Sequence, residues 1–471
     1  MKHLKLNITL VLVLSLLMAT VLQARPKAAA PADFEAKQAA WQAHQSLLAT
    51  SPYAGLQWRS VGPVVQGGRL VDMEVVPGKP YTFYVAYASG GLWKTTNNGH
   101  TFEPLFDDQP SIIMGDIAVD PNNPETIWVG TGENNSSRSS YGGMGVYRSD
   151  DAGQSWSYVG LGDTDRIGRI LIDPNDSNTV YVAALGKLYT PGGQRGIFRT
   201  MDGGKSWQQV MKGDDWTGVI DLVFKPDDTK TLYAAAWDRK RRPWDFTEGG
   251  TGSAIYKSVD GGDSWSRLEG GLPRGEHVGR IGLAVSAASP DTLYASIDNQ
   301  QPLPEDQWNL GDRPISAKRL RNMSKEEFLA QDKNEIEAFI RRSDFDVNVD
   351  ADKLIEWVTT DKVSIQDIID ELGDANANLF NTDIVGLQVW RSDDAGANWK
   401  LTHDRPIDQV VYSYGYYFGE IRVSPANADQ VYVLGVPMVK SDDGGKTWFS
   451  VQGRKVHADH QSMWINPEHP D

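Results

Sequence analysis

One eight-residue motif returns along most of this chain and constrains its fold more than any other feature. It reads Ser/Thr-x-Asp-x-Gly-x-x-Trp and is clearest at residues 149–156. Close copies occupy residues 200–207, 258–265, 392–399 and 441–448, and a weaker copy that ends in Phe occupies residues 95–102. The hydroxyl and the carboxylate can accept hydrogen bonds from backbone N–H groups in a tight turn, and the Gly suits a left-handed backbone. Regular recurrence of this kind predicts a tandem structural repeat.

The repeat unit is clearest in the third unit, whose first strand is followed by Asp-Pro-Asn at residues 173–175. Four short, mostly apolar segments bounded by turn residues fall at 169–172, 179–183, 196–200 and 206–210. Four short antiparallel strands per unit, repeated in tandem, predict an all-β fold, the β-propeller. We call the strand that opens each unit its first strand. The sequence contains seven such strands but only six motif copies, so we expect a seven-bladed propeller with six complete blades. The seventh would begin at Gln461, and we expect the chain to continue beyond Asp471.

The chain divides by pattern into four segments. Residues 1–24 are expected to be a signal peptide, with Lys2 and Lys5 before an apolar run that is short for a membrane anchor, the alternative. Residues 25–55 are expected to hold a helix and a linker, and residues 56–471 the propeller. Residues 301–380 are expected to form a helical insertion in blade five, with a capping box at residues 324–327. This insertion could cover one face of the propeller or be a solvated decoration.

Composition restricts the class of partner. The formal net charge is −16 and no basic cluster dominates the chain, which argues against nucleic acid and against a membrane after signal cleavage. The chain has no Cys, so no disulfide framework is possible, and we expect a secreted or periplasmic bacterial protein stabilised by packing. No Gly-rich phosphate cradle occurs, and we expect no cofactor.

A set of charged residues is expected at the mouth of the central channel. Counting back five residues from the proline that follows each first strand gives Asp72, Asp116, Arg169, Asp221, Glu420 and Ser462, with Gly282 at the inferred place in blade five. Such a ring could hold a polar ligand, and its four acids are the residues that we would test first for catalysis. Alternatively, neighbouring blades could pair these charges only to complete their strands.

Two loops are the next candidates for ligand binding. The stretch 237–244 frames four cations with two Trp, and its Trp237, Arg239, Arg241 and Trp244 could stack on a sugar or bind a carboxylate. It could equally form salt bridges with the insertion. In the matching loop of blade two, 132–138, the charged residues are Glu133 and Arg138. A long polar loop is more often simply solvated.

A third candidate lies just before the strand that would begin the seventh unit. His457, Asp459 and His460 could ligate a metal or move protons, but no further ligand follows at a diagnostic spacing. Polar packing at a blade junction is therefore the favoured reading, and no metal is expected. An aromatic run at residues 412–418 could stack on a ligand or pack between blades.

These features together resemble a known family. The repeated motif matches the Asp-box. The chain is similar to exported bacterial proteins described as sortilin N-terminal-like, or Asp-box (BNR) "glycosyl hydrolase" repeat proteins. The features that carry this resemblance are the motif copies, the first-strand landmarks and the stretches 237–244, 373–378 and 457–460. The resemblance covers nearly everything after residue 55. Members of this family typically continue into a second propeller.

The resemblance implies two classes of function. Sortilin-type receptors bind peptides and proteins, whereas xyloglucanase-type hydrolases cleave β-glucan between two propellers, with one Asp from each. Here Ser89 stands where the first of those acids would be needed. We therefore expect an exported propeller that binds a peptide, protein or glycan at the channel mouth. The alternative is a glycoside hydrolase of the two-propeller type.

Overall fold

The computed structural model describes most of the chain after residue 33. The described residues are 34–56, 68–242, 245–304, 315, 319–320, 323–342, 349–371, 384–404, 407, 410–411, 414–453 and 456–470. The chain divides into two compact units, Met1–Ser60 and Val61–Asp471. The predicted signal peptide, and all but the first residue of the strand expected at residues 56–61, lie outside the described residues.

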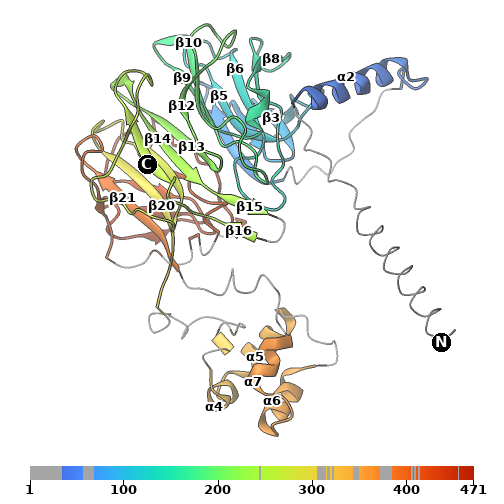
Figure 1. Ribbon diagram of the computed structural model, residues 1–471, viewed down its shortest axis with the longest axis vertical. Coiled ribbons are helices and arrows are strands. Elements are labelled where there is room, and N and C mark those ends of the chain that lie inside the picture. The colour runs from blue at the N-terminus through green and yellow to red at the C-terminus, as the bar shows by residue number, and fades with distance from the viewer. Residues whose placement is uncertain are drawn as a thin grey trace, which may run out of the picture. The chain divides into compact units, whose positions relative to one another are not determined.

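The second unit is an all-β propeller of six four-stranded antiparallel sheets (Figure 1). Blade one has β1 (Leu70–Val75), β2 (Phe83–Tyr87), β3 (Gly91–Thr95) and β4 (Glu103–Pro104). Blade two has β5 (Met114–Val119), β6 (Ile127–Thr131), β7 (Val146–Ser149) and β8 (Ser157–Gly160), followed by the short helix η1 (Gly162–Thr164). Blade three has β9 (Ile167–Asp173), β10 (Asp176–Ala184), β11 (Gly196–Thr200) and β12 (Gln208–Lys212). Its four strands match the predicted segments.

The other three blades repeat this order. Blade four has β13 (Thr217–Lys225), β14 (Asp228–Asp238), β17 (Ala254–Ser258) and β18 (Ser266–Arg267), with a hairpin of β15 (Lys240–Arg242) and β16 (Asp245–Thr247) between its second and third strands. Blade five has β19 (Val278–Val285), β20 (Leu293–Pro302), β21 (Ile384–Ser392) and β22 (Lys400–Leu401). Blade six has β23 (Ile421–Val423), β24 (Val431–Val433), β25 (Val439–Ser441) and β26 (Phe449–Ser450). Antiparallel pairing places the start of each first strand beside the end of each second strand, and we call this end of the channel the mouth.

The seven-bladed expectation is corrected to six blades in the part of the chain that the structure describes. Residues 456–470 add no strand to the six sheets. Instead, Ser462 Oγ lies 3.4 Å from Asp72 Oδ1, and Asn135 Nδ2 donates to Gln461 Oε1 over 3.3 Å. This segment is therefore held by side chains of blades one and two, and a seventh blade stays a prediction.

The repeated motif forms the turn that its residues predict. In blade two, the Gly153 N–H donates to Ser149 Oγ over 2.8 Å, and the Ser155 N–H donates to Asp151 Oδ1 over 2.8 Å. The Ser155 hydroxyl also donates to Asp151 Oδ2, and the hydrogen bonds from the Ser155 hydroxyl and N–H lower the pKa of Asp151 to about 2. Gly153 has φ +92°, a left-handed value that favours Gly. Trp156 then donates from Nε1 to the Leu105 carbonyl of blade one, so the turn also ties neighbouring blades together.

The propeller core is divided among the blade interfaces. Five clusters of buried apolar side chains each combine residues of neighbouring sheets, from blades one and two through to blades five and six. Blade-to-blade packing of the apolar faces is therefore the main source of stability. Where backbones meet most closely only Gly fits, as at Gly282, where a Cβ would overlap the Gly419 carbonyl oxygen.

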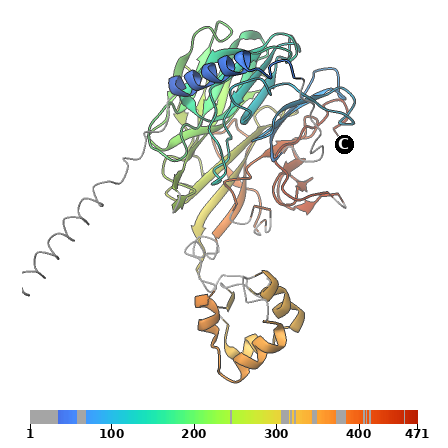
Figure 2. The ribbon, with the colours of Figure 1, turned by 90° about the vertical axis from the view of Figure 1, so that its right-hand side faces the viewer.

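Helices make up a small part of the structure. The first unit contains α2 (Phe34–Thr50). Between β20 and β21 lie α4 (Lys325–Leu329), α5 (Lys333–Arg342), α6 (Ala351–Thr359) and α7 (Ile365–Glu371), which Figure 2 shows as one group. These helices share a cluster of buried apolar side chains. The predicted capping box is confirmed, because Ser324 accepts from the Glu327 N–H while Glu327 accepts from the Ser324 N–H. Among the described helices, none is long and apolar enough to cross a membrane.

Candidate functional site

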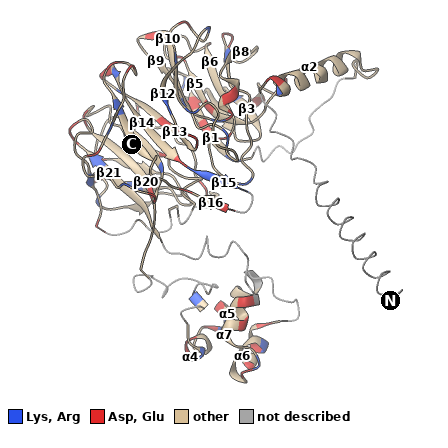
Figure 3. Ribbon diagram, in the orientation of Figure 1, with Lys and Arg blue, Asp and Glu red and all other residues tan. Residues whose placement is uncertain are grey.

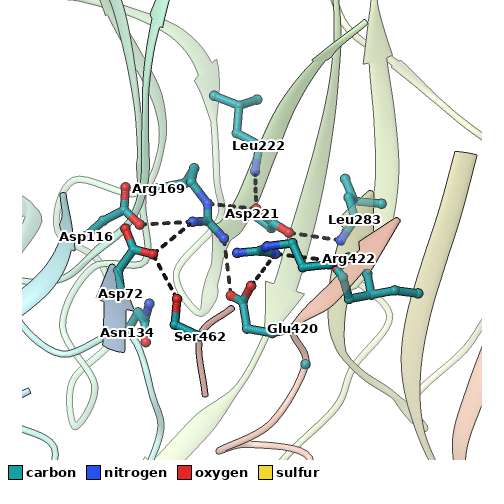
Figure 4. Close-up of polar contacts among 12 residues, drawn as sticks. Asp72, Asp116, Asn134, Arg169, Asp221, Leu222, Leu283, Glu420, Arg422 and Ser462 are labelled. Carbon is teal, nitrogen blue, oxygen red and sulfur yellow. Dashed lines mark hydrogen bonds and ion pairs between the residues drawn. The ribbon is translucent and has the colours of Figure 1, made fainter. Parts of the chain in front are cut away.

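Arg169 of β9 lies at the centre of the channel with four carboxylates around it (Figure 4). Its Nε is 3.0 Å from Asp221 Oδ1, and its Nη1 is 3.2 Å from Asp116 Oδ1. Its Nη2 is 3.2 Å from Glu420 Oε1, and Asp72 Oδ1 lies 3.9 Å from Nη1. The structure therefore brings together the five charged positions that the sequence places at this level of the channel.

The same carboxylates also join neighbouring blades. Asp116 of blade two accepts a 2.6 Å hydrogen bond from the Ile170 N–H of blade three. Equivalent bonds join Asp72 to the Ile117 N–H (3.3 Å) and Asp221 to the Leu283 N–H (2.9 Å). Each of these Asp residues thus uses one oxygen for the next blade and the other for Arg169.

Burial and charge act in opposite directions on these carboxyls. Burial raises the pKa of Asp72 and raises that of Asp116 well above its usual range, although the Arg169 guanidinium opposes the shift. For Glu420, burial is outweighed by the guanidinium groups of Arg422 and Arg169, which lower its pKa to about 2. The Arg422 Nη1 lies 2.5 Å from Glu420 Oε2.

This geometry favours the structural reading of the ring. Each of its acids forms an ion pair or hydrogen bond with Arg169, with Arg422 or with a backbone amide. None of these contacts directs a carboxylate toward a space where a ligand could bind. Arg169 itself is occupied by carboxylates and so is a poor donor for an added ligand. A catalytic role for the four acids, or a ligand role for Arg169, stays a prediction.

The blade-two loop at the mouth is buried rather than solvated. Glu133 is fully buried and forms a two-pronged ion pair with Arg69, and it also accepts from Asn135 Nδ2 over 3.2 Å. Arg138 is exposed, and its carbonyl accepts a 2.8 Å hydrogen bond from the Tyr189 hydroxyl. Of the two predicted ligand residues, Arg138 is therefore the one that reaches solvent.

The loop of blade four places its aromatic anchor inside the protein. Trp237 is fully buried, and its Nε1 donates to the Glu248 carbonyl over 2.7 Å. The Arg239 guanidinium lies 4.9 Å from the centre of the Trp237 ring and is also buried. Trp237 therefore cannot offer its ring to a ligand as expected, because Arg239 and the core cover it. Trp244 lies outside the described residues.

Arg241, in the basic strand β15 that Figure 3 shows beside β16, is held between aromatic rings. Its guanidinium lies 4.1 Å from the centre of the Phe246 ring and 5.8 Å from that of Tyr416. Tyr416 packs edge-on against Phe246, and the neighbouring Tyr414 is 39% exposed. The aromatic run thus forms interblade packing with a partly exposed rim at the mouth.

Sequence reasoning missed a pair of carboxyl groups, Glu248 and Asp298, and the charge of Arg241 acts on Glu248. Gln300 Nε2 lies 2.6 Å from Asp298 Oδ2 and 3.3 Å from Glu248 Oε2, so the two carboxyl oxygens are less than about 6 Å apart. Asp298 is 4% exposed, and no described group lies within hydrogen-bond distance of its Oδ1. Glu248 is partly exposed and comes from the end of the hairpin segment.

The environments of these two carboxyls raise the pKa of both. Burial, followed by the charge of Asp298, raises the pKa of Glu248 well above its usual range. Burial also raises the pKa of Asp298, to about 6, although the Gln300 amide and the Arg280 guanidinium oppose the shift. Two neighbouring carboxyls with raised pKa values can act as proton donor and acceptor near neutral pH. The only sequence signal was an acid at the polar end of an apolar strand, Leu293–Pro302.

The histidine segment contacts blade six through its backbone. The His460 N–H donates to the Gly435 carbonyl over 2.8 Å, and the Asp459 N–H donates to the Val436 carbonyl over 3.0 Å. His457 Nδ1 lies 2.5 Å from the Ala458 carbonyl oxygen. Within the described ranges, no group of three His, Cys, Asp or Glu side chains could hold a metal ion. The geometry therefore favours polar packing at this junction.

Comparisons with known proteins agree with the resemblance found in the sequence. A family model described as sortilin, neurotensin receptor 3, matches residues 144–349. A xyloglucanase of Paenibacillus sp is 22% identical over 260 residues, which cover 48% of this chain and 23% of that protein. Xyloglucanase Xgh74A of Acetivibrio thermocellus is 31% identical over 222 residues, covering 40% of this chain and 24% of that protein.

The likeness extends to solved structures. The crystal structure of an ancestral GH74 enzyme superposes with a TM-score of 0.50 at 16% identity, over 84% of this chain and 40% of that chain. At this identity the likeness concerns the fold alone. The chain spans about a quarter of the length of the curated relatives it matches. These matches confirm the resemblance to sortilin-like, Asp-box propellers with glycosyl hydrolase relatives.

Proposed function

We propose that this propeller hydrolyses a polysaccharide bound across the mouth of its channel, with Glu248 and Asp298 as the reacting carboxyl pair. The observation that carries the proposal is the pair itself, which the Gln300 amide bridges. Hydrolysis of a glycosidic bond needs two carboxyls that flank it. The xyloglucanase relatives support a carbohydrate substrate, although the matched residues cover only about a quarter of each relative.

The spacing suggests how the pair would react. Carboxyls about 5–5.5 Å apart suit a retaining mechanism, in which one acts as nucleophile and the other as acid and then base. Glu248, the more exposed of the two and with a pKa that burial raises, would protonate the leaving oxygen. Asp298, with a pKa of about 6, would be ionised at neutral pH and attack the anomeric carbon. Water, deprotonated by Glu248, would then release the sugar from Asp298.

The test is release of reducing ends from a panel of neutral and acidic polysaccharides that includes xyloglucan. Glu248→Gln should lower kcat by at least about 10²-fold, the usual contribution of a positioned acid, while leaving substrate binding intact. A matched control is Glu269→Gln, because Glu269 is 62% exposed and pairs only with the exposed Arg274. If every polysaccharide is left intact by the wild-type protein, or Glu248→Gln is as active as Glu269→Gln, the proposal fails.

A second candidate is the binding of a peptide or protein at the same mouth. The match of the sortilin model to residues 144–349 favours it, because that range includes blades three and four. Binding of an extended peptide without hydrolysis of any polysaccharide would select this candidate. Export of the protein, a second propeller beyond residue 471 and a seventh blade remain predictions for either function.

A further inference from the structure

Besides Arg241 Nε, three buried hydrogen-bond donors near the mouth have no partner among the described residues. They are Ser136 Oγ, Arg166 Nε and Arg239 Nη2. All three residues are at least nine-tenths buried, with 0%, 3% and 1% of their surface exposed. Such donors are expensive to leave unpaired, and each therefore indicates a position where an acceptor belongs.

These donors border one segment of the blade-two loop. Arg239 Nη1 donates to the Asn135 carbonyl over 3.2 Å, which places its guanidinium next to Ser136. Arg166 Nη2 donates to the Ser140 carbonyl over 2.9 Å at the other end of the same segment. The Ser136 N–H donates to the Tyr416 carbonyl over 3.3 Å. Segment 135–140 thus contacts the Arg239 guanidinium at one end and the Arg166 guanidinium at the other, and the charge of Arg166 acts on Arg239.

The charge at this place is not balanced. Arg280 shares Asn135 with Arg239, donating to Asn135 Oδ1 over 2.7 Å, and both guanidinium groups lie over the Trp237 ring. Among the described residues, neither Arg239 nor Arg280 forms an ion pair, and Arg166 pairs with its neighbour Asp165. Burial and the nearby guanidinium groups lower the pKa of Arg239 well below its usual range. Asp165, which pairs with Arg166, opposes this shift, but no described acid lies within ion-pair distance of Arg239.

We infer that Arg239, with Arg166 and Ser136, forms a binding site for a carboxylate carried by a sugar unit of the polysaccharide. A planar carboxylate matches the fork of a guanidinium group and would supply the missing acceptors and the missing charge. The rim of aromatic side chains at the mouth offers faces for the sugar ring. This inference rests on the proposed function and deepens it, because it makes the substrate a polysaccharide that contains uronic acid.

Access to the site requires a change in the loop. Arg239 is 1% exposed, whereas Arg138 in the same segment is exposed. A carboxylate can therefore reach Arg239 only if segment 135–140 shifts, and Arg138 is placed to meet the anion first. Amide hydrogen exchange in residues 135–140 should consequently change when the anion binds.

The test uses the full chain in a buffer free of carboxylate and phosphate, with three probes. Trigalacturonate should raise the melting temperature, because a ligand that binds only the folded state stabilises it, whereas uncharged galactotriose should not. Acetate, the third probe, tests whether a carboxylate without a sugar also raises the melting temperature. A shift of equal size with acetate would overturn the assignment to a sugar, and no shift with any probe would overturn the site, leaving buried water as the acceptor.

Variants separate binding from structure. Arg239→Met should weaken trigalacturonate binding by at least about tenfold while leaving the melting temperature of the free protein unchanged or higher, because it removes an uncompensated buried charge. Ser136→Ala, a smaller change, should weaken binding severalfold, and Arg274→Met at an exposed position should leave it unchanged. A lower melting temperature for Arg239→Met with unaltered binding would mean a structural role and overturn the inference. Polysaccharide hydrolysis that depends on Glu248 is measured separately, so either proposal can fail alone.

Discussion

Replacing Arg169 by Met should strongly destabilise the propeller. Three carboxylates lie within 3.2 Å of its guanidinium, and a fourth lies at 3.9 Å. Removing one partner of a buried ion pair typically costs about 3–5 kcal/mol, because the other charge is left buried and unpaired. Here several acids lose the same cation, so the free energy of unfolding should fall by at least about 3 kcal/mol at pH 7.

The same variant makes a prediction about pH. Without Arg169, the folded-state pKa values of Asp72 and Asp116, which burial already raises, should rise further above their unfolded values. A carboxyl with a raised folded-state pKa destabilises the fold when it is ionised and ceases to do so as the pH falls and it takes up a proton. The difference between wild type and Arg169→Met should therefore narrow between pH 7 and pH 5.

The assay is urea unfolding of both proteins at the two pH values, with Arg274→Met as control. Arg274 forms an exposed ion pair with Glu269, so its loss should cost no more than about 1 kcal/mol. A loss for Arg169→Met as small as that of the control would refute the claim that Arg169 holds the ring together. If the difference in unfolding free energy between wild type and Arg169→Met widens between pH 7 and pH 5, the charges assigned to Asp72 and Asp116 are wrong.

Three further predictions follow from single contacts. If Asp298 attacks and Glu248 protonates, a pH–rate profile should show kcat/KM rising through about pH 6 as Asp298 ionises, and Glu248→Gln should keep this rise at a lower rate; a profile that is flat through pH 6 would contradict the role of Asp298. Trp237→Ala should lower the free energy of unfolding by about 3–5 kcal/mol in urea, because the ring is fully buried; an unchanged value would mean that the ring does not fill the core. Gly282→Ala should reduce soluble yield and melting temperature, because the added Cβ would overlap the Gly419 carbonyl, and wild-type behaviour would contradict that close approach.

The parts of the fold that repeat could be predicted from the sequence. The motif turns depend on local hydrogen bonds within eight residues, so their chemistry is visible in each copy. The ring around Arg169 could be located as well, because equivalent positions in a propeller converge on one axis. Counting residues from the prolines therefore found Asp72, Asp116 and Asp221. What the count could not show is that these carboxylates are held by neighbouring blades.

The rest of the site depends on segments that break the repeat. Glu248 and Asp298 lie 50 positions apart and meet only because the hairpin β15–β16 extends the loop of blade four toward the end of β20. Glu133 looked like part of a solvated loop because its neighbours are polar, but Arg69, 64 positions earlier, neutralises it in the interior. The cations that follow Trp237 in the sequence predict a ligand platform, yet the guanidinium groups of Arg239 and Arg280 lie over its ring.

The most direct test of the central claim is to trap the covalent intermediate. An activated 2-deoxy-2-fluoro glycoside of a sugar that the protein hydrolyses should label the wild-type chain once, and peptide mass spectrometry should place the label on Asp298. Asp298→Asn should remain unlabelled, while Glu269→Gln should be labelled as the wild type is. A label on Asp72, Asp116 or Asp221 would contradict the assignment of the carboxyl pair and return catalysis to the central ring.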